Sequence, residues 1–295
     1  MLRLVFWIGS AGALIALAAW VLFLPERVAP SDIAGIEPDL ARGEYVFNAA
    51  GCASCHSVQR SPPGQRLVLA GGQEFKSDFG TFVAPNISSH PTAGIGSWSR
   101  LDIVNAVRHG TSPEGRHYYP AFPYATYARA NLSDLVSLAA YLETLPADPT
   151  PSQPHDIAFP FNIRAGVGAW KFLYVDTDWV VEATTEEEER GRYLVEALGH
   201  CAECHTPRDS LGGLDRTRWM AGAPNPSGDG RIPNITPAEL DWSADDIAAY
   251  LESGFTPDFD VVGGSMASVV ISLSNLPPED HLAIANYLKA LPAIP

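Results

Sequence analysis

Two copies of the pattern C-x-x-C-H constrain this chain more than any other feature. One copy spans Cys52–His56 and the other spans Cys201–His205, and together they contain all four cysteines of the 295 residues. Two thiols followed at once by an imidazole form a compact set of groups that can bind a metal or a cofactor. No thiol remains for a disulfide framework or for a lone nucleophile. We therefore expect one binding unit that occurs twice.

The contiguous arrangement predicts that each motif carries a covalently attached haem c, which contains iron. The cysteines form thioether bonds with the haem, and the histidine that follows them supplies one axial ligand to the iron. The residues assigned in this way are Cys52, Cys55 and His56 for one haem, and Cys201, Cys204 and His205 for the other. The alternatives are a zinc site or a redox dithiol. The two cysteine pairs lie in separate repeats, which disfavours zinc, and no strand precedes either motif as in thioredoxin-like dithiols.

The segments around the motifs repeat as well. Arg42–Tyr45 and Arg190–Tyr193 both read Arg-Gly-x-Tyr, and each precedes a motif at a similar distance. Both copies later contain Pro-Asn-Ile, Trp-Ser and a closing Tyr-Leu-x-x-Leu-Pro. Each copy is expected to run helix, motif, long loop, helix, second loop and last helix. The predicted division is an anchor over 1–30, a first domain over 31–148, a proline- and aromatic-rich interdomain segment over 149–184, and a second domain over 185–295.

The second axial ligand is predicted from the methionines, which are Met1, Met220 and Met266. Met266 follows Gly263 and Gly264 late in the second copy, where glycines let the backbone approach the face of a haem. It is the predicted partner of His205 on the second iron, and such ligation raises the reduction potential. The alternatives are that Met266 fills the core or that Met220 is the ligand.

The first copy has no methionine at the corresponding place. Counted back from an Asn-Leu pair that both copies share, Phe122 stands where Met266 stands in the second copy. Phenylalanine cannot bind iron, so the sixth ligand of the first haem stays open between a histidine, another group and none. The candidate histidines, from nearest to farthest in sequence, are His117, His109 and His90.

The N-terminus predicts a membrane anchor. Leu4–Leu24 has no charge, and at ~1.5 Å per residue it is long enough to cross a hydrocarbon core of ~30 Å. Trp7 and Trp20 lie near its ends, and Arg3 precedes it, which places the N-terminus in the cytoplasm and the remainder outside. The alternative is a cleaved signal peptide, but no small-residue cleavage pattern precedes Pro25.

The charge excludes one class of partner. The formal net charge is -15 and the pI is about 4.8. Nucleic acids are recognised through basic patches, so no nucleic-acid partner is expected. An acidic surface favours basic protein partners.

Further segments resemble a known family. They are Thr81–Ser88, Gly94–Trp98, Tyr119–Tyr124, Pro160–Arg164, Trp170–Lys171 and Gly199–Arg208. With them, the chain after about Asp39 resembles the cytochrome c subunits of bacterial membrane-bound alcohol, gluconate and related dehydrogenases, and most closely a shorter, two-haem branch. The resemblance implies a mainly α fold, with two class I cytochrome c-like domains in tandem preceded by one transmembrane helix. Many members carry three haem motifs and a methionine at the place of Phe122, so the particular dehydrogenase stays open.

These observations predict an electron-transfer protein of a respiratory chain. A single-pass dihaem cytochrome c would relay electrons on the periplasmic side of the cytoplasmic membrane, between a dehydrogenase or quinol-linked donor and a downstream cytochrome or oxidase. The alternatives are a redox enzyme or ligand-binding protein that uses an open iron in the first domain, and a gas or redox sensor. No triad, phosphate loop or dinucleotide fingerprint is evident, so no catalytic residue is predicted.

Overall fold

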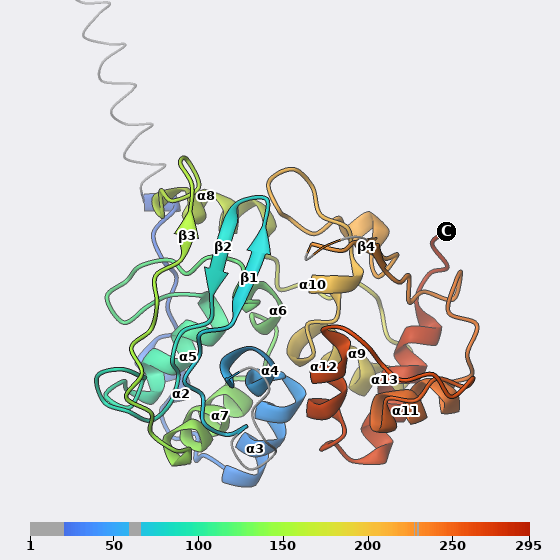
Figure 1. Ribbon diagram of the computed structural model, residues 1–295. Coiled ribbons are helices and arrows are strands. Elements are labelled where there is room, and N and C mark those ends of the chain that lie inside the picture. The colour runs from blue at the N-terminus through green and yellow to red at the C-terminus, as the bar shows by residue number, and fades with distance from the viewer. Residues whose placement is uncertain (1–20, 59–65, 227, 229) are drawn as a thin grey trace, which may run out of the picture.

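The computed structural model describes residues 21–58, 66–226, 228 and 230–295. Short helices joined by long loops dominate these residues, with two small antiparallel sheets (Figure 1). The helices are α2 (Pro30–Ile33), α3 (Leu40–Ala49), α4 (Cys52–His56), α5 (Arg100–His109), α6 (Tyr124–Tyr127), α7 (Leu132–Thr144), α8 (Ala165–Tyr174), α9 (Glu186–Tyr193), the π-helical turn η2 (Leu194–Leu198), α10 (Ala202–His205), the 3-10 turn η3 (Arg216–Arg218), α11 (Ala244–Ser253), α12 (Met266–Leu273) and α13 (Pro278–Ala290). The strands are β1 (Glu74–Ser77), β2 (Gly80–Val83), β3 (Asp156–Ile157), β4 (Ala223–Pro224) and β5 (Arg231–Ile232).

Helices α3, α5 and α7 form the first helical group. The apolar spacing of α7 buries Leu135 and Leu138 in the core, which stabilises the fold by on the order of 2 kcal/mol for each side chain. Helices α3 and α7 cross so closely at Gly43 that a Cβ atom there would collide with the carbonyl oxygen of Ser137. Helix α5 starts at a capping box and ends at Gly110, whose φ of 56° closes the helix in the left-handed region.

Helices α9, α11 and α13 form a second group with the same construction. A Cβ atom on Gly191 would collide with the carbonyl oxygen of Ala283 in α13, as one on Gly43 would with α7. Helix α11 also starts at a capping box and ends at a left-handed glycine, Gly254, with a φ of 77°. The two Arg-Gly-x-Tyr segments therefore use their glycine for the same purpose, which is a close crossing of two helices.

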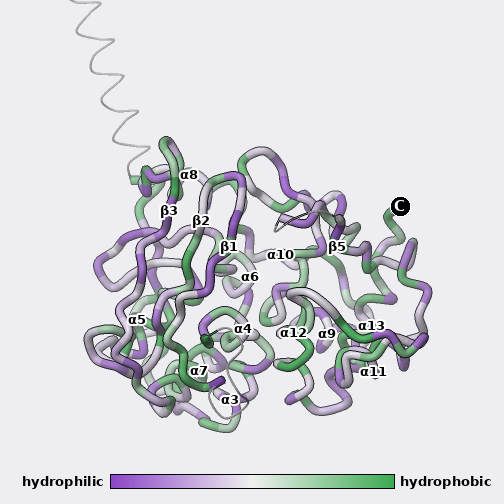
Figure 2. Tube along the Cα trace, in the orientation of Figure 1, coloured by the Kyte–Doolittle hydropathy of each residue, from purple (hydrophilic) through white to green (hydrophobic). Residues whose placement is uncertain are grey.

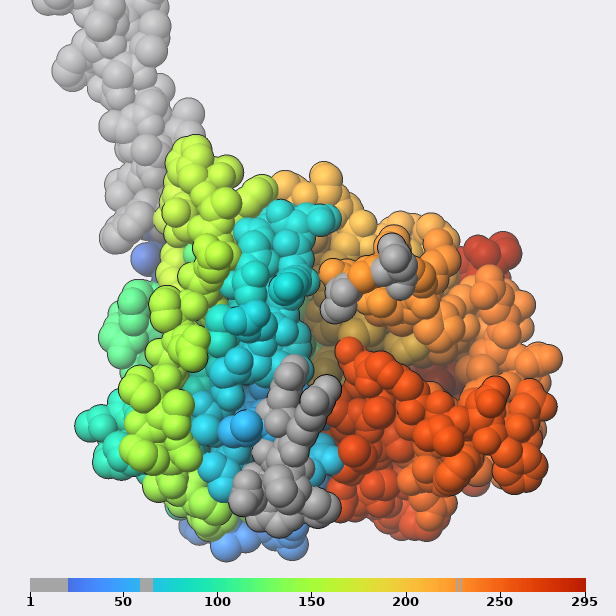
Figure 3. Space-filling model, viewed as in Figure 1, coloured from blue at the N-terminus to red at the C-terminus, as the bar shows by residue number. Residues whose placement is uncertain are grey.

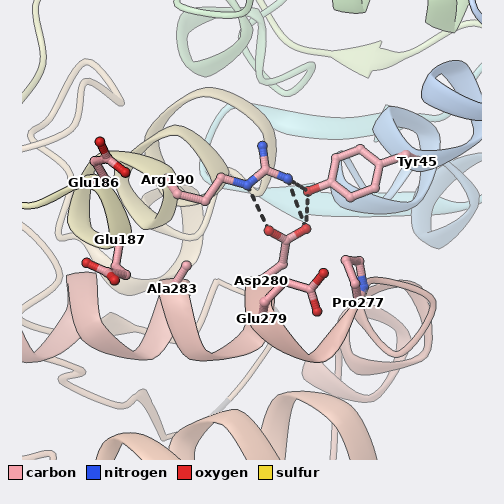
Figure 4. Close-up of a pocket in the computed structure, with 8 residues that line it drawn as sticks. All are labelled: Tyr45, Glu186, Glu187, Arg190, Pro277, Glu279, Asp280 and Ala283. Atoms are coloured by element: carbon pink, nitrogen blue, oxygen red, sulfur yellow. Dashed lines mark hydrogen bonds and ion pairs between the residues drawn. The ribbon is translucent and has the colours of Figure 1, made fainter.

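The two groups lie side by side, the first in blue to green and the second in yellow to red (Figures 1 and 3). A tyrosine from each group reaches the other group. The Tyr45 hydroxyl donates to Asp280 in α13 at 2.5 Å, and Arg190 donates to the same carboxylate at 2.7 and 3.0 Å (Figure 4). This contact joins the start of α13 to α3 and α9 at once.

The second tyrosine makes the same contact in the opposite direction. The Tyr193 hydroxyl donates to Asp134 in α7 at 2.5 Å, and Arg42 donates to both oxygens of Asp134 at 2.7 Å. Each arginine thus binds a carboxylate of its own group, and each tyrosine binds the carboxylate of the other. Such reciprocity is the pattern of a two-fold interface between identical subunits, here formed within one chain.

The connection between the two groups touches both of them. Strand β3 pairs with β2, with Gly80 opposite Ile157, and extends the β1–β2 hairpin to three strands. In α8, the Lys171 ammonium donates to the carbonyl oxygen of His109 at 2.6 Å and to that of Gly110 at 2.8 Å. The Trp170 indole donates to the carbonyl oxygen of Leu211, beyond the second motif, at 3.0 Å.

The predicted transmembrane helix is the part of the fold class that has to be corrected. The longest helices that the structure describes, α7 and α13, have 13 residues each, and at ~1.5 Å per residue they fall short of a core of ~30 Å. Within the described ranges, no helix has the length and apolar character that a membrane crossing requires. Most of the predicted span Leu4–Leu24 lies in residues 1–20, outside the described residues, and its last four residues end in a turn at Leu24.

Candidate haem-binding sites

Each C-x-x-C-H motif folds as a short helical turn, in α4 and in α10. The residue before the first cysteine has a left-handed backbone in both copies, with a φ of 61° at Gly51 and 42° at His200. This sharp bend follows the preceding helix at once, so the two thiols and the imidazole come from one turn of chain. The carbonyl oxygen of each motif histidine accepts from a glycine at 2.8 Å, from Gly71 in the first copy and Gly222 in the second.

Backbone carbonyls set the tautomer of both motif histidines. His56 Nδ1 lies 2.9 Å from the carbonyl oxygen of Pro85, and His205 Nδ1 lies 2.8 Å from that of Pro233. A carbonyl can only accept, so each Nδ1 carries the proton and donates it. Burial lowers the pKa of both imidazoles, which favours the neutral ring. A neutral ring of this tautomer has its lone pair on Nε2, ready to bind iron.

The cysteines have the properties of attachment residues. All four are free of disulfide bonds. Burial raises the pKa of Cys52 and of Cys201 to about 12 and that of Cys55 to about 11, which disfavours the thiolate that a redox dithiol needs. In the part of the chain that the structure describes, no group of three or more His, Cys, Asp or Glu side chains could hold a metal ion.

Both motifs therefore fit haem c, because each offers two thiols for thioether bonds and one imidazole for the iron. When bound, each haem supplies an iron that changes between the ferrous and ferric states.

Met266 is the first residue of α12, two residues after the left-handed Gly264, and is half-buried. The helix is mostly apolar, with two serines, and appears largely green in Figure 2. The glycine caps show that Met266 and Phe122 are equivalent positions of the repeat. Met266 lies as many residues after Gly254 as Phe122 lies after Gly110. In both copies, an isolated antiparallel bridge forms between the glycine cap and this position, from Thr111 to His117 and from Phe255 to Val261, and it keeps the two positions equivalent. Ligation by Met266 stays a prediction that this position supports.

Met220 occupies a different kind of position. It is fully buried, and its carbonyl oxygen accepts from Ile235 at 2.9 Å. In the first copy, Leu69 is fully buried and accepts from Ile87 at 3.0 Å in the same way. A position where leucine serves equally in the other copy is a core position, so Met220 packs as a hydrophobic side chain.

The histidines proposed for the first iron have other partners. His117 Nε2 lies 3.0 Å from the carbonyl oxygen of Phe23, and its backbone forms the bridge that Val261 forms in the second copy. His109 Nδ1 lies 3.4 Å from the carboxylate of Glu26. His90 Nδ1 accepts from the backbone N–H of Ala93 at 3.1 Å and shapes its own loop. The structure thus gives each of the three a contact that does not involve the first motif.

One residue near the motifs escaped sequence reasoning. His200 precedes Cys201 and extends toward the first motif, where its Nε2 donates to the carbonyl oxygen of Ala50 at 3.2 Å. The available signal was its place in the repeat, because the first copy has Gly51 there. A histidine where glycine would relieve the backbone indicates a role for the side chain.

Comparisons with known proteins agree with this chemistry. The family model of cytochrome c matches residues 40–146. The chain is 56% identical to a protein named "Diheme cytochrome c-type" from Cereibacter sphaeroides, over 97% of each chain. It is 38% identical to the fructose dehydrogenase cytochrome subunit of Gluconobacter japonicus, over 90% of this chain and 55% of that protein. It is 32% identical to the cytochrome c subunit of the quinone-dependent alcohol dehydrogenase of Gluconobacter oxydans, over 87% of this chain and 55% of that protein.

The fold and the two motifs define a c-type cytochrome. The chain belongs to the family of dihaem cytochromes c that is related to the cytochrome c subunits of bacterial alcohol, gluconate and fructose dehydrogenases. It carries two covalently attached haem c groups and transfers electrons, and the predicted cytochrome c fold and cofactors are confirmed. It spans about half the length of the dehydrogenase subunits named above.

Proposed function

We propose that this protein is an electron relay, in which electrons arrive in one copy and leave from the other toward a second redox protein. One observation carries the proposal, which is that each motif contacts the opposite copy. Ser54, inside the first motif, donates to the carbonyl oxygen of Ser268 in α12 at 3.0 Å. Thr126 in α6 donates to Glu203, inside the second motif, at 3.4 Å. Electron tunnelling falls steeply with distance, so contacts that hold the attachment segments together favour transfer between them.

The proposal assigns the iron ligands and attachment residues as follows. The first copy, over 31–148, holds haem through Cys52, Cys55 and His56, and the second copy, over 185–295, holds it through Cys201, Cys204, His205 and Met266. Residues 149–184 connect the copies. This division is supported by the helix crossings, because the α3–α7 and α9–α13 pairs each lie within one copy.

The proposed donor is a dehydrogenase or a quinol-linked protein, and the proposed acceptor is a cytochrome or oxidase. The names of the relatives as dehydrogenase subunits support the donor. We place the relay in the periplasm, since attachment of haem through C-x-x-C-H suits an exported protein. The net charge of -15 favours a basic contact surface on the partner.

The relay is tested by counting electrons delivered to such a partner. The fully reduced protein, freed of excess reductant, is mixed with an excess of a basic oxidised cytochrome c. We expect about two electron equivalents per chain to appear on the acceptor, at a rate that falls as salt is added. Delivery of about one equivalent would mean that one haem takes no part, and the relay would be rejected.

A second function is favoured by one observation in the first copy. Phe122 occupies the register position of Met266, and its ring packs against the rings of Tyr118 and Tyr127, with centroids 6.2 and 6.0 Å apart. His117 is engaged with Phe23. We propose that the first iron keeps an open position on the side of Phe122, where a small neutral ligand such as a diatomic gas binds.

Carbon monoxide and a Phe122→Met variant test the open position. The reduced wild type is expected to bind about one carbon monoxide per chain, because His–Met ligation closes the second iron. Phe122→Met should abolish this binding and raise the potential of the first haem, since it supplies the missing thioether. Phe122→Leu is the control, because it removes the ring without adding a ligand and should still bind the gas. A wild type that binds none would show that another group closes the first iron.

A further inference from the structure

The backbone of His200 is strained where the other copy avoids strain. Gly51 and His200 each precede the first cysteine of a motif, and each has a positive φ, of 61° and 42°. Glycine adopts this region freely, whereas a side chain there meets steric conflict. A histidine at such a position points to a function of the side chain that offsets the conflict.

The His200 side chain crosses from the second copy to the first. Its Nε2 donates to the carbonyl oxygen of Ala50 at 3.2 Å, and its ring meets the ring of Tyr127 edge to face, at 5.9 Å and 85°. A Cβ atom on Gly51 would lie 3.8 Å from His200 Nε2, so the imidazole lies against the residue that precedes Cys52.

The acceptor of this bond is a buried carbonyl oxygen at the end of a helix, where the helix itself supplies no donor. Ala50 is the C-cap of α3, and carbonyl oxygens at a helix C-terminus lack N–H donors within the helix. The Tyr127 hydroxyl, from the same copy, donates to this carbonyl at 3.0 Å, and His200 supplies the second bond from the other copy. His200, directly before Cys201, is therefore joined to Ala50, two residues before Cys52, through one buried carbonyl.

Other contacts place the two attachment segments together. The Ser54 hydroxyl lies 3.1 Å from the Ser272 hydroxyl of α12, in addition to its bond with Ser268. Among these contacts, the bond from His200 is the one that links the two bends directly before the cysteines.

We propose that His200 is a positioning residue that clamps the two haem-attachment segments together and thereby sets the distance for electron transfer between the haems. The inference rests on the proposed relay. The clamp acts through the Ala50 carbonyl and the Tyr127 ring, and takes no electron itself.

The test uses two variants of the full-length haem-loaded protein. His200→Gly removes the imidazole and relieves the backbone, so folding of the second copy is retained. His200→Gln keeps an amide N–H at the same number of bonds from the backbone as His Nε2, and serves as the conservative rescue. Phe259→Gly is the matched control, because Phe259 also has a positive φ, of 64°, but it is 84% exposed and its backbone N–H donates to Thr256 within its own loop.

Amide hydrogen exchange over residues 48–57 is the first readout. Loss of the clamp should speed exchange there by about tenfold in His200→Gly, equivalent to ~1.4 kcal/mol, with little change in His200→Gln or Phe259→Gly. The second readout is the rate at which one electron equilibrates between the haems after flash photoreduction. This rate should fall severalfold in His200→Gly alone, while the absorption spectrum of each haem stays that of the wild type.

Each failure is distinguishable. Unchanged exchange over 48–57 in His200→Gly would overturn the clamp. Faster exchange with an unchanged electron-transfer rate would overturn its role in setting the distance. A wild type in which electrons never equilibrate would instead contradict the relay itself, and that result is independent of the variants.

Discussion

Replacement of Met266 by alanine is expected to lower the midpoint potential of the second haem by on the order of 0.2 V, within the ~0.8 V range that axial ligands span. The thioether favours the ferrous state, and no other methionine within the described residues has a comparable position, because Met220 lies in the core. The iron that loses this ligand should also bind carbon monoxide when reduced. Spectroelectrochemical titration and gas titration of the purified variant measure both effects.

Met220→Leu is the control for this prediction. Leucine already stands at the corresponding position of the first copy, as the fully buried Leu69. The substitution conserves volume and should cost less than ~1.5 kcal/mol of stability while leaving both potentials in place. If Met220→Leu lowers the potential and Met266→Ala does not, the assignment of the sixth ligand is wrong.

Asp280→Ala is expected to lower the free energy of unfolding by about 2–4 kcal/mol. Asp280 is 2% exposed, and loss of its carboxylate leaves the Tyr45 hydroxyl without its acceptor and the Arg190 guanidinium with the Tyr45 oxygen alone. Removal of one partner from a fully buried ion pair costs ~3–5 kcal/mol, and the effect is smaller here because the Arg190 side chain keeps 36% of its exposure. The expected loss concerns the contact between the copies as well as the second copy itself.

Urea unfolding followed by far-ultraviolet circular dichroism measures this loss. Glu279→Ala is the matched control, since it removes an exposed carboxylate next to Asp280 and should change stability by less than ~0.5 kcal/mol. Equal stability of the two variants would contradict the role assigned to the Arg190–Asp280–Tyr45 contact.

The sequence was sufficient for features that depend on local spacing. The C-x-x-C-H motifs are contiguous, so their chemistry needs no tertiary information. The repeat also showed that Phe122 stands at the position that Met266 has in the second copy. The glycine caps Gly110 and Gly254 keep this correspondence in the structure. The repeat also contained Gly43 and Gly191, but only the structure shows that each fills a place at a helix crossing that admits no side chain.

Features that depend on how the copies meet could not be predicted. Tyr45 and Tyr193 look like ordinary helix residues, and only the packed structure shows that each binds the carboxylate of the other copy. The bond from His200 to Ala50 spans 150 positions of sequence and has no local signal beyond the exchange of glycine for histidine. The predicted membrane span rested on the uncharged run Leu4–Leu24 and the residues at its ends, and the described residues contain no helix of that length and apolar character.

The most direct test of the relay is the fate of one electron placed on the oxidised protein. A flash-excited photoreductant delivers less than one electron per chain, and the α-band absorbance of the two haems is followed over time. The account predicts that reduction first distributes over both copies and then collects in the second, where His–Met ligation raises the potential. It is contradicted if the electron stays where it first arrives, with no transfer between the copies before it is lost to an external acceptor.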